Sequence, residues 1–169
     1  MAASYLATDY LFTCSLRAMI RAQSKVDSSF LYKFDHPLSF GKVGWGDAIH
    51  CYNLTCHAGE LPFLFNPVKD LNISMTPEED VLTSRMQAYW ANFFYSGNPS
   101  SGPFSVQVSW PQYDASTDQD LRITTPSFYV ESRLKQEQCD FWDSIGYDKG
   151  ETLIKAMANL ILKQAYEEK

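Results

Sequence analysis

The clearest hydrophobic pattern in the chain lies between residues 76 and 97 and predicts an amphipathic helix. Apolar side chains recur there at helical spacing, at Val81, Leu82, Met86, Tyr89, Trp90 and Phe93. Thr76 is the expected N-cap, and Glu79, three residues later, would complete a capping box. Gly97 is expected to end the helix, because Pro99 prevents its continuation.

Two weaker patterns precede this helix. A rough helical stripe over residues 4–24 predicts a first helix, which the polar run after it ends. Residues 29–36 alternate, with Phe30, Tyr32 and Phe34 on one side, and this alternation predicts a strand that stops at Pro37. The glycine- and proline-rich stretch 37–56 is expected to be a long loop with a functional role.

The second half of the chain has a less regular pattern. Residues 98–127 are rich in Pro, Ser and Asp, and we expect them on the surface with one or two short strands. Residues 129–145 and 150–167 are predicted to form two further helices. No repeat or linker divides the chain, so its 169 residues fit one domain or one piece of a larger domain.

Composition narrows the class of protein. The chain is 45% hydrophobic and 15% aromatic, which is enough for a packed core. Its net charge is −6, with no long block of Lys or Arg, and this argues against a nucleic-acid partner. No apolar stretch approaches the roughly 18 residues of a membrane helix, so no membrane span is expected.

Two features indicate an exported protein, although the N-terminus lacks the pattern of a secretory signal. The chain has four cysteines, an even number compatible with two disulfides. It also has two glycosylation sequons, which start at Asn53 and Asn72. We therefore expect an exported glycoprotein of which this chain is an excised piece.

The chain has three histidines, at His36, His50 and His57. His36 precedes a proline at the end of the predicted strand and is interpreted as exposed or structural. The segment HCYNLTCH, residues 50–57, carries two Cys and two His and invites a zinc interpretation. Its spacing does not match the usual zinc sites, so we expect no metal.

His57 would act as a general base only with a nucleophile beside it. No G-x-S-x-G motif occurs in the chain, and the serines of NPSSGPF (98–104) lie in a turn-like stretch. On the residues alone, a structural histidine is the more common interpretation, and the catalytic interpretation stays open.

Six segments, in order, resemble the C-terminal portion of the cholinesterase and type-B carboxylesterase family of α/β-hydrolases. They are DYLFTC (9–14), SFLYKFDHP (29–37), CHAGELPFLF (56–65), MQAYWANFFYSGNP (86–99), WPQYD (110–114) and CDFWD (139–143). The resemblance covers some 130 residues, and the order of the motifs makes it specific. It implies an α/β fold, here a C-terminal fragment of an α/β-hydrolase fold with mostly helices and a few strands.

The resemblance makes His57 the catalytic histidine. In this family that residue takes the proton of a nucleophilic serine and then gives it to the leaving alcohol. The chain order is Ser, then Asp or Glu, then His, so a C-terminal piece would carry only the histidine. One departure is Ala58, where the family usually has Gly; a methyl group there matters if the backbone needs the conformation that Gly allows.

The resemblance also gives the cysteines a role. It implies a disulfide between Cys14 and Cys139, which leaves Cys51 and Cys56 to pair locally or to stay free.

Together these expectations describe the C-terminal part of a secreted carboxylic ester hydrolase. The whole protein would act on a small-molecule ester without a cofactor, and the isolated chain would be inactive and would associate with itself. The alternative is a catalytically dead cholinesterase-like domain that serves in adhesion or binds a partner.

Overall fold

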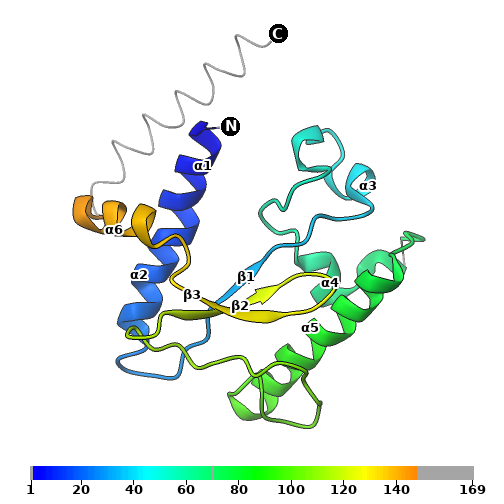
Figure 1. The fold of residues 1–169 in the computed structure, drawn as a ribbon. Coiled ribbons are helices and arrows are strands. Elements are labelled where there is room, and N and C mark those ends of the chain that lie inside the picture. The colour runs from blue at the N-terminus through cyan, green and yellow to red at the C-terminus, as the bar shows by residue number, and fades with distance from the viewer. Residues whose placement is uncertain (1, 70, 148–169) are drawn as a thin grey trace.

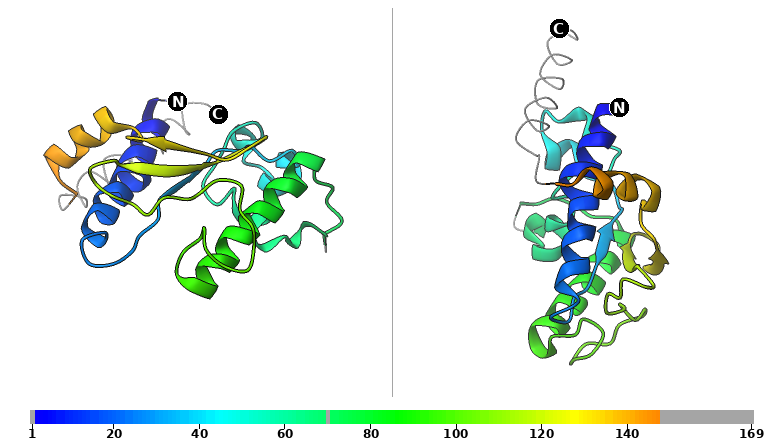
Figure 2. Two further views of the ribbon diagram at one scale, coloured as in Figure 1. Left: turned by 60° about the horizontal axis from the view of Figure 1, so that its bottom comes forward. Right: turned by 90° about the vertical axis from the view of Figure 1, so that its left-hand side faces the viewer.

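A computed structural model describes residues 2–69 and 71–147 (Figure 1). A small sheet lies between a long N-terminal helical segment on one side and helix α5 on the other (Figures 1 and 2). The elements in chain order are α1 (Ala2–Thr8), the π-helical η1 (Asp9–Thr13), α2 (Cys14–Gln23), β1 (Tyr32–Phe34), α3 (Gly41–Trp45), η2 (Ile49–Cys51), α4 (Leu61–Phe65), η3 (Pro67–Lys69), α5 (Pro77–Ser96), β2 (Gln119–Ile123), β3 (Tyr129–Ser132) and α6 (Gln136–Ile145).

Helix α5 confirms the prediction for residues 76–97. The hydroxyl of Thr76 accepts a hydrogen bond from the Glu79 N–H at 3.2 Å, and the Glu79 carboxylate accepts one from the Thr76 N–H at 2.9 Å. At the other end Gly97 adopts a left-handed conformation with φ of 77°. Glycine carries no Cβ penalty there, so it terminates the helix readily.

The sheet has the strand order β1-β2-β3. Strands β1 and β2 are parallel, with Tyr32 opposite Leu121, and β2 and β3 are antiparallel, with Leu121 opposite Val130. The expected strand at 29–36 is therefore present but shorter, and β2 is one of the strands expected within 98–127. The expected surface position of 98–127 is wrong for β2, because it is the central strand and Leu121 and Ile123 are completely buried.

The prediction of a helix over residues 129–145 is wrong in its first part. Residues 129–132 form strand β3, because Tyr129 and Val130 pair with β2, and aromatic and β-branched residues favour strands. The helix starts only at Gln136, after Lys135 with φ of 49°. The helix expected at 150–167 lies outside the described residues.

The expected long loop at 37–56 is also not free of structure. It contains the short helix α3 and the 3-10 turn η2, and α4 follows soon after it. Each of these helices has five residues or fewer, which is too short to show a helical period in the sequence.

The main core lies between the sheet and α5. Its buried members come from β1, α4, α5, β2 and the connections between them: Phe34, Leu38, Phe40, Phe63, Val68, Leu82, Met86, Tyr89, Trp110, Leu121, Ile123 and Phe128. Burial of each large apolar side chain contributes about 1.5–3 kcal/mol to folding. This core fixes the sheet, and through Phe63 it holds α4, which follows the segment that carries His57.

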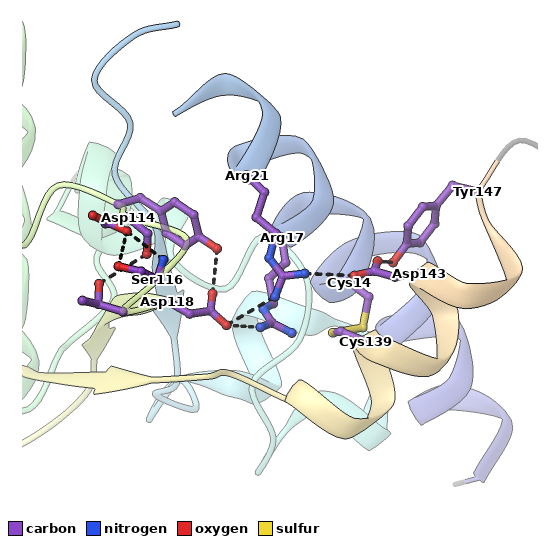
Figure 3. A network of polar contacts seen from close by, with 11 residues as sticks. Cys14, Arg17, Arg21, Asp114, Ser116, Asp118, Cys139, Asp143 and Tyr147 are labelled. Carbon is purple, nitrogen blue, oxygen red and sulfur yellow. Dashed lines mark hydrogen bonds and ion pairs between the residues drawn. A yellow bond between two sulfur atoms is a disulfide. The ribbon is translucent and has the colours of Figure 1, made fainter. Parts of the chain in front are cut away.

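A second, smaller cluster joins the N-terminal helices to α6. It consists of Tyr10, Cys14, Cys139 and Trp142. Cys14 and Cys139 form the disulfide that the resemblance implies, with a sequence separation of 125 residues (Figure 3). A loop of that length corresponds to about 4–5 kcal/mol of stabilisation in the chain-entropy model.

Ion pairs connect the same helices to the start of the sheet, as Figure 3 shows. Arg17, which is only 1% exposed, pairs with Asp118, and Arg21 pairs with Asp143 at 3.0 Å. Asp118 also accepts a hydrogen bond from the Tyr113 hydroxyl at 2.7 Å. One disulfide and several ion pairs thus connect residues that are far apart in sequence.

Candidate active site around His57

His57 lies on a tight turn between two fixed points. On its N-terminal side is a disulfide between Cys51 and Cys56, and on its C-terminal side is α4. The turn is closed by a hydrogen bond from the Gly59 N–H to the Cys56 carbonyl at 3.0 Å. The His57 side chain is exposed, and its ring lies against Phe12 with the ring centroids 4.7 Å apart.

The contact with Phe12 brings a distant segment to His57. Phe12 belongs to the π-helical segment η1, which interrupts the helix between α1 and α2. Such π-turns are frequent at functional sites. The planes of the two rings make an angle of 32°, so the phenyl ring limits the orientation of the imidazole on one side.

The Cys51–Cys56 disulfide settles which of the two open states these cysteines adopt: they pair locally. Paired cysteines offer no thiolate to a metal, so the zinc interpretation of residues 50–57 loses two of its four ligands. Within residues 2–69 and 71–147, His, Cys, Asp and Glu nowhere form a group of three or more suited to a metal ion.

Ala58, directly after the histidine, has φ of 67°. This is the left-handed region, which costs a non-glycine residue about 1–2 kcal/mol. The departure from the family pattern noted in the sequence therefore falls on a position whose backbone favours glycine. Gly59 beside it has no room for a side chain, because a Cβ would lie 2.9 Å from the Cys56 carbonyl oxygen.

Aromatic side chains of the main core lie next to the turn. Phe34 and Trp45 approach the position of a Gly59 Cβ to 3.6 Å, and Phe63 of α4 is completely buried. Burial, with a contribution from the charge of Glu60, raises the pKa of Tyr32 to about 12.

The imidazole of His57 makes no hydrogen bond to any other described residue. It is exposed to solvent. Chemistry on a substrate would also need a nucleophile within hydrogen-bond reach and a group that orients the ring. The described part of the chain supplies no such nucleophile and no hydrogen bond that orients the ring; only the contact with Phe12 limits its orientation.

The other two histidines have different surroundings. His50 is exposed within η2. His36 is structural, as one of its two interpretations proposed: its Nε2 is hydrogen-bonded to the Glu79 carboxylate at 3.1 Å and its Nδ1 to the Thr125 hydroxyl at 3.0 Å. This hydroxyl–imidazole–carboxylate row resembles a triad in its order, but Glu79 is completely buried and also completes the capping box of α5.

The sequence left the role of His36 open because its partners lie 43 and 89 residues away. The capping box at Thr76 was the only signal that pointed to Glu79.

Both sequon asparagines, Asn53 and Asn72, are exposed. None of the described helices is long and apolar enough to cross a membrane.

Comparisons with known proteins place this geometry in context. The family model described as the carboxylesterase family matches residues 1–142. Acetylcholinesterase 1 of Caenorhabditis elegans is 30% identical in an alignment of 144 positions, which covers 79% of this chain and 22% of that protein. Acetylcholinesterase of Electrophorus electricus is 32% identical in an alignment of 120 positions, which covers 69% of this chain and 18% of that protein.

Solved structures give the same picture. A thermophilic PNB esterase matches with a TM-score of 0.65 and 26% identity, over 80% of this chain and 26% of the esterase chain. A second PNB esterase structure matches with a TM-score of 0.63 and 28% identity, over 79% of this chain and 26% of that one. The chain thus spans about a fifth of the length of the two acetylcholinesterases and about a quarter of these esterases.

Proposed function

Because this chain belongs to the carboxylesterase family, we propose that it is the C-terminal part of a carboxylic ester hydrolase in which His57 is the general acid and base. The observation that carries the proposal is the family match over residues 1–142, which includes the whole His57 turn. Residues 1–169 would then be a partial domain, and the nucleophile and the acid would lie in other segments of the whole protein.

The proposed chemistry is that of a serine hydrolase triad. A serine hydroxyl attacks the ester carbonyl while His57 takes its proton, and His57 then donates that proton to the leaving alcohol. Water attacks the resulting acyl-enzyme, and His57 again takes a proton and returns it to the serine. The small-molecule ester needs no cofactor in this scheme.

The rigid support of His57 suits this task. The disulfide on one side, α4 on the other and Phe12 against the ring limit the freedom of the imidazole. A general base must be held within hydrogen-bond reach of the group that it deprotonates. In the isolated chain no serine nucleophile is present in a G-x-S-x-G context, so we expect it to be inactive.

A second candidate is a cholinesterase-like adhesion or partner-binding module that has lost catalysis. The left-handed Ala58 favours it, because a methyl group stands where the family usually has Gly, directly beside the histidine. A G-x-S-x-G motif in the whole protein would support the hydrolase, and a substituted serine would support the binding module.

We further propose that the protein is exported and glycosylated. Two disulfides are typical of oxidising compartments, and both sequon asparagines are exposed.

Self-association is also part of the proposal. Strand β1 is at one edge of the sheet, and Phe94 and Tyr95 on α5 are 81% and 77% exposed, so an edge and an apolar surface are open to another chain.

A chimera tests the proposed role of His57. Residues 1–142 would replace the matching segment of a PNB esterase, and hydrolysis of p-nitrophenyl acetate would be measured. His57→Gln should lower kcat/KM by at least about 1,000-fold, as loss of a triad member does. His50→Gln is the matched control, because His50 is also exposed and lies seven positions earlier.

The isolated chain gives the complementary measurement. The isolated chain should hydrolyse the same ester only slowly. Its rate should fall no more in the His57→Gln variant than in the His50→Gln variant, which measures the contribution of any exposed imidazole. A folded, active chimera whose rate survives His57→Gln would refute the catalytic role. A His57-dependent burst from the isolated chain would reveal an unrecognised nucleophile.

A further inference from the structure

The sequon Asn53-Leu54-Thr55 lies wholly inside the loop that the Cys51–Cys56 disulfide closes. We propose that the redox state of this cysteine pair decides whether Asn53 is glycosylated: the open loop accepts a glycan and the closed loop excludes it. The inference rests on the proposed export of the protein and not on its ester chemistry.

The closed loop holds the sequon in a bent form. Fully extended, the five steps from Cys51 to Cys56 would span about 17 Å, whereas the disulfide holds the two Cα atoms 5.7 Å apart. A turn hydrogen bond from the Leu54 N–H to the Cys51 carbonyl, at 3.4 Å, bends the chain further. Asn53 and Thr55 are exposed, so geometry and not burial is what limits the sequon.

The N-terminal side of the loop is fixed independently of the disulfide. The Tyr52 hydroxyl donates to the Gly46 carbonyl at 2.6 Å. The Tyr52 backbone also packs tightly on Gly41, where a Cβ would lie 2.7 Å from the Tyr52 carbonyl oxygen. Without the disulfide, residues 53–55 would keep this anchor on one side only and would become free to extend.

Two reactions therefore compete for the same short segment. In the first, the thiols of Cys51 and Cys56 form the disulfide and lose two electrons and two protons to the disulfide of an oxidoreductase, by thiolate attack. In the second, Asn53 Nδ2 forms a bond to the anomeric carbon of a lipid-pyrophosphate-linked oligosaccharide. The bond from that carbon to the pyrophosphate oxygen breaks, and the amide proton passes to a base of the transferase.

A transferase that reads asparagine and threonine together must bind both side chains in one site. An open segment can adapt to that site, and a ring of six residues closed by a disulfide cannot. The order of the two reactions then determines the product. Early closure leaves Asn53 unmodified, and early transfer gives a glycan four residues before His57.

The second sequon is an internal control. Asn72 is exposed and lies between η3 and α5, outside the loop that the Cys51–Cys56 disulfide closes and 16 residues after Cys56. Its acceptance of a glycan should not depend on that pair. The Cys14–Cys139 disulfide provides the matched control variant, because its loss removes a disulfide without opening the loop around Asn53.

The experiment expresses the full chain behind a cleavable secretory leader in cultured animal cells. Glycan occupancy at Asn53 and Asn72 is measured by enzymatic deglycosylation in heavy-oxygen water and peptide mass spectrometry. Cys51→Ser with Cys56→Ser should raise occupancy at Asn53 several-fold and leave Asn72 unchanged. Cys14→Ser with Cys139→Ser should leave Asn53 as low as in the unchanged chain.

Three results would overturn the inference. One is high occupancy at Asn53 in unchanged chains whose Cys51–Cys56 disulfide is intact in a non-reducing digest. Another is an Asn53 that stays unmodified after Cys51→Ser with Cys56→Ser, whatever happens at Asn72. The last is an equal rise at Asn53 in the Cys14→Ser, Cys139→Ser control. Because the leader delivers the chain to the transferase, natural export is tested separately, by glycan analysis of the native protein.

Discussion

Two completely buried carboxylates, Glu79 at the start of α5 and Asp120 in β2, have opposite surroundings. Glu79 accepts hydrogen bonds from the Ser39 N–H at 2.8 Å, the Ser39 hydroxyl at 2.5 Å, the Thr76 N–H at 2.9 Å and His36 at 3.1 Å. Neither carboxylate oxygen of Asp120 has a hydrogen-bond partner among the described residues. Two equally buried carboxylates can therefore differ in the free-energy cost of burying their charge.

The pKa values of the two groups show this difference. Burial alone would raise the pKa of Glu79, but the hydrogen bonds from Ser39, Thr76 and His36 outweigh it, and the pKa lies below its ordinary value. Burial raises the pKa of Asp120 to about 6, because the attraction of Arg122 offsets only part of the cost. A buried charge is thus tolerated where donors surround it and is costly where they do not.

The largest expected effect comes from removing the satisfied carboxylate. Glu79→Ala should lower the free energy of unfolding by about 3–4 kcal/mol, because it leaves several buried donors without an acceptor and also creates a cavity. Urea unfolding followed by circular dichroism would measure it. Glu78→Ala is the matched control, since Glu78 is an exposed acid in the same helical turn, and it should change little.

Removing the unsatisfied charge should have the opposite sign. Asp120→Asn should raise the free energy of unfolding at pH 7.5 by about 2 kcal/mol, because a raised pKa means that ionisation is unfavourable in the folded state. The exposed Asp140→Asn is the control for a simple change of net charge. A loss of stability at pH 7.5 in Asp120→Asn would show that the charge of Asp120 is satisfied in solution.

The pH dependence should separate the two groups further. The folded pKa of Glu79 is lowered, so its contribution is complete above about pH 4.5 and is lost as the pH falls through the folded pKa. The folded pKa of Asp120 is raised, so stability falls as the pH rises from 3.8 to about 6.

Stability profiles from pH 3 to 8 would test this, with a slope of at most about 1.4 kcal/mol per pH unit for each proton. Asp120→Asn should remove the fall between pH 4 and pH 6, and Glu79→Gln should weaken the loss below pH 4.5. Profiles of both variants that parallel the unchanged protein would contradict the assignment.

The smallest effect isolates one hydrogen bond near Glu79. Thr76→Ala removes the hydroxyl that accepts from the Glu79 N–H, but it keeps every donor to the Glu79 carboxylate, including the Thr76 N–H, and it should cost about 1 kcal/mol. Thermal unfolding is sensitive enough to detect this change. Thr76→Ser keeps the hydroxyl and should restore most of the stability; an equal loss in both variants would point to the methyl group instead.

The sequence predicts one of these carboxylates and not the other. The spacing of Thr76 and Glu79 identifies a capping box, because both partners are three residues apart. In β2, Leu121 and Ile123 lie on the core side, and simple alternation would place Asp120 on the solvent side. Its burial depends on segments far away in sequence, such as α2, whose Arg17 pairs with Asp118 at the start of the strand.

The sequence likewise predicts only those parts of the candidate site that a local motif or the family resemblance identifies. The motif around His57 identifies the family, and the Cys14–Cys139 disulfide follows from the resemblance. The stacking of Phe12 on His57 joins residues 45 positions apart, with no local pattern to announce it. The wrong start of the helix at 129–145 has the same origin, because Tyr129 and Val130 adopt a strand only when β2 is beside them.

The parallel pairing of β1 with β2 has a consequence for the order of folding. Tyr32 meets Leu121, so a ribosome must release some 90 further residues before β1 finds its partner. Helix α5, whose cap is local, is complete well before that moment. Long-range parallel pairs form slowly because loop closure precedes any gain in contact energy. During synthesis β1 therefore waits unpaired, and this interval is when a chaperone would be of most use to the chain.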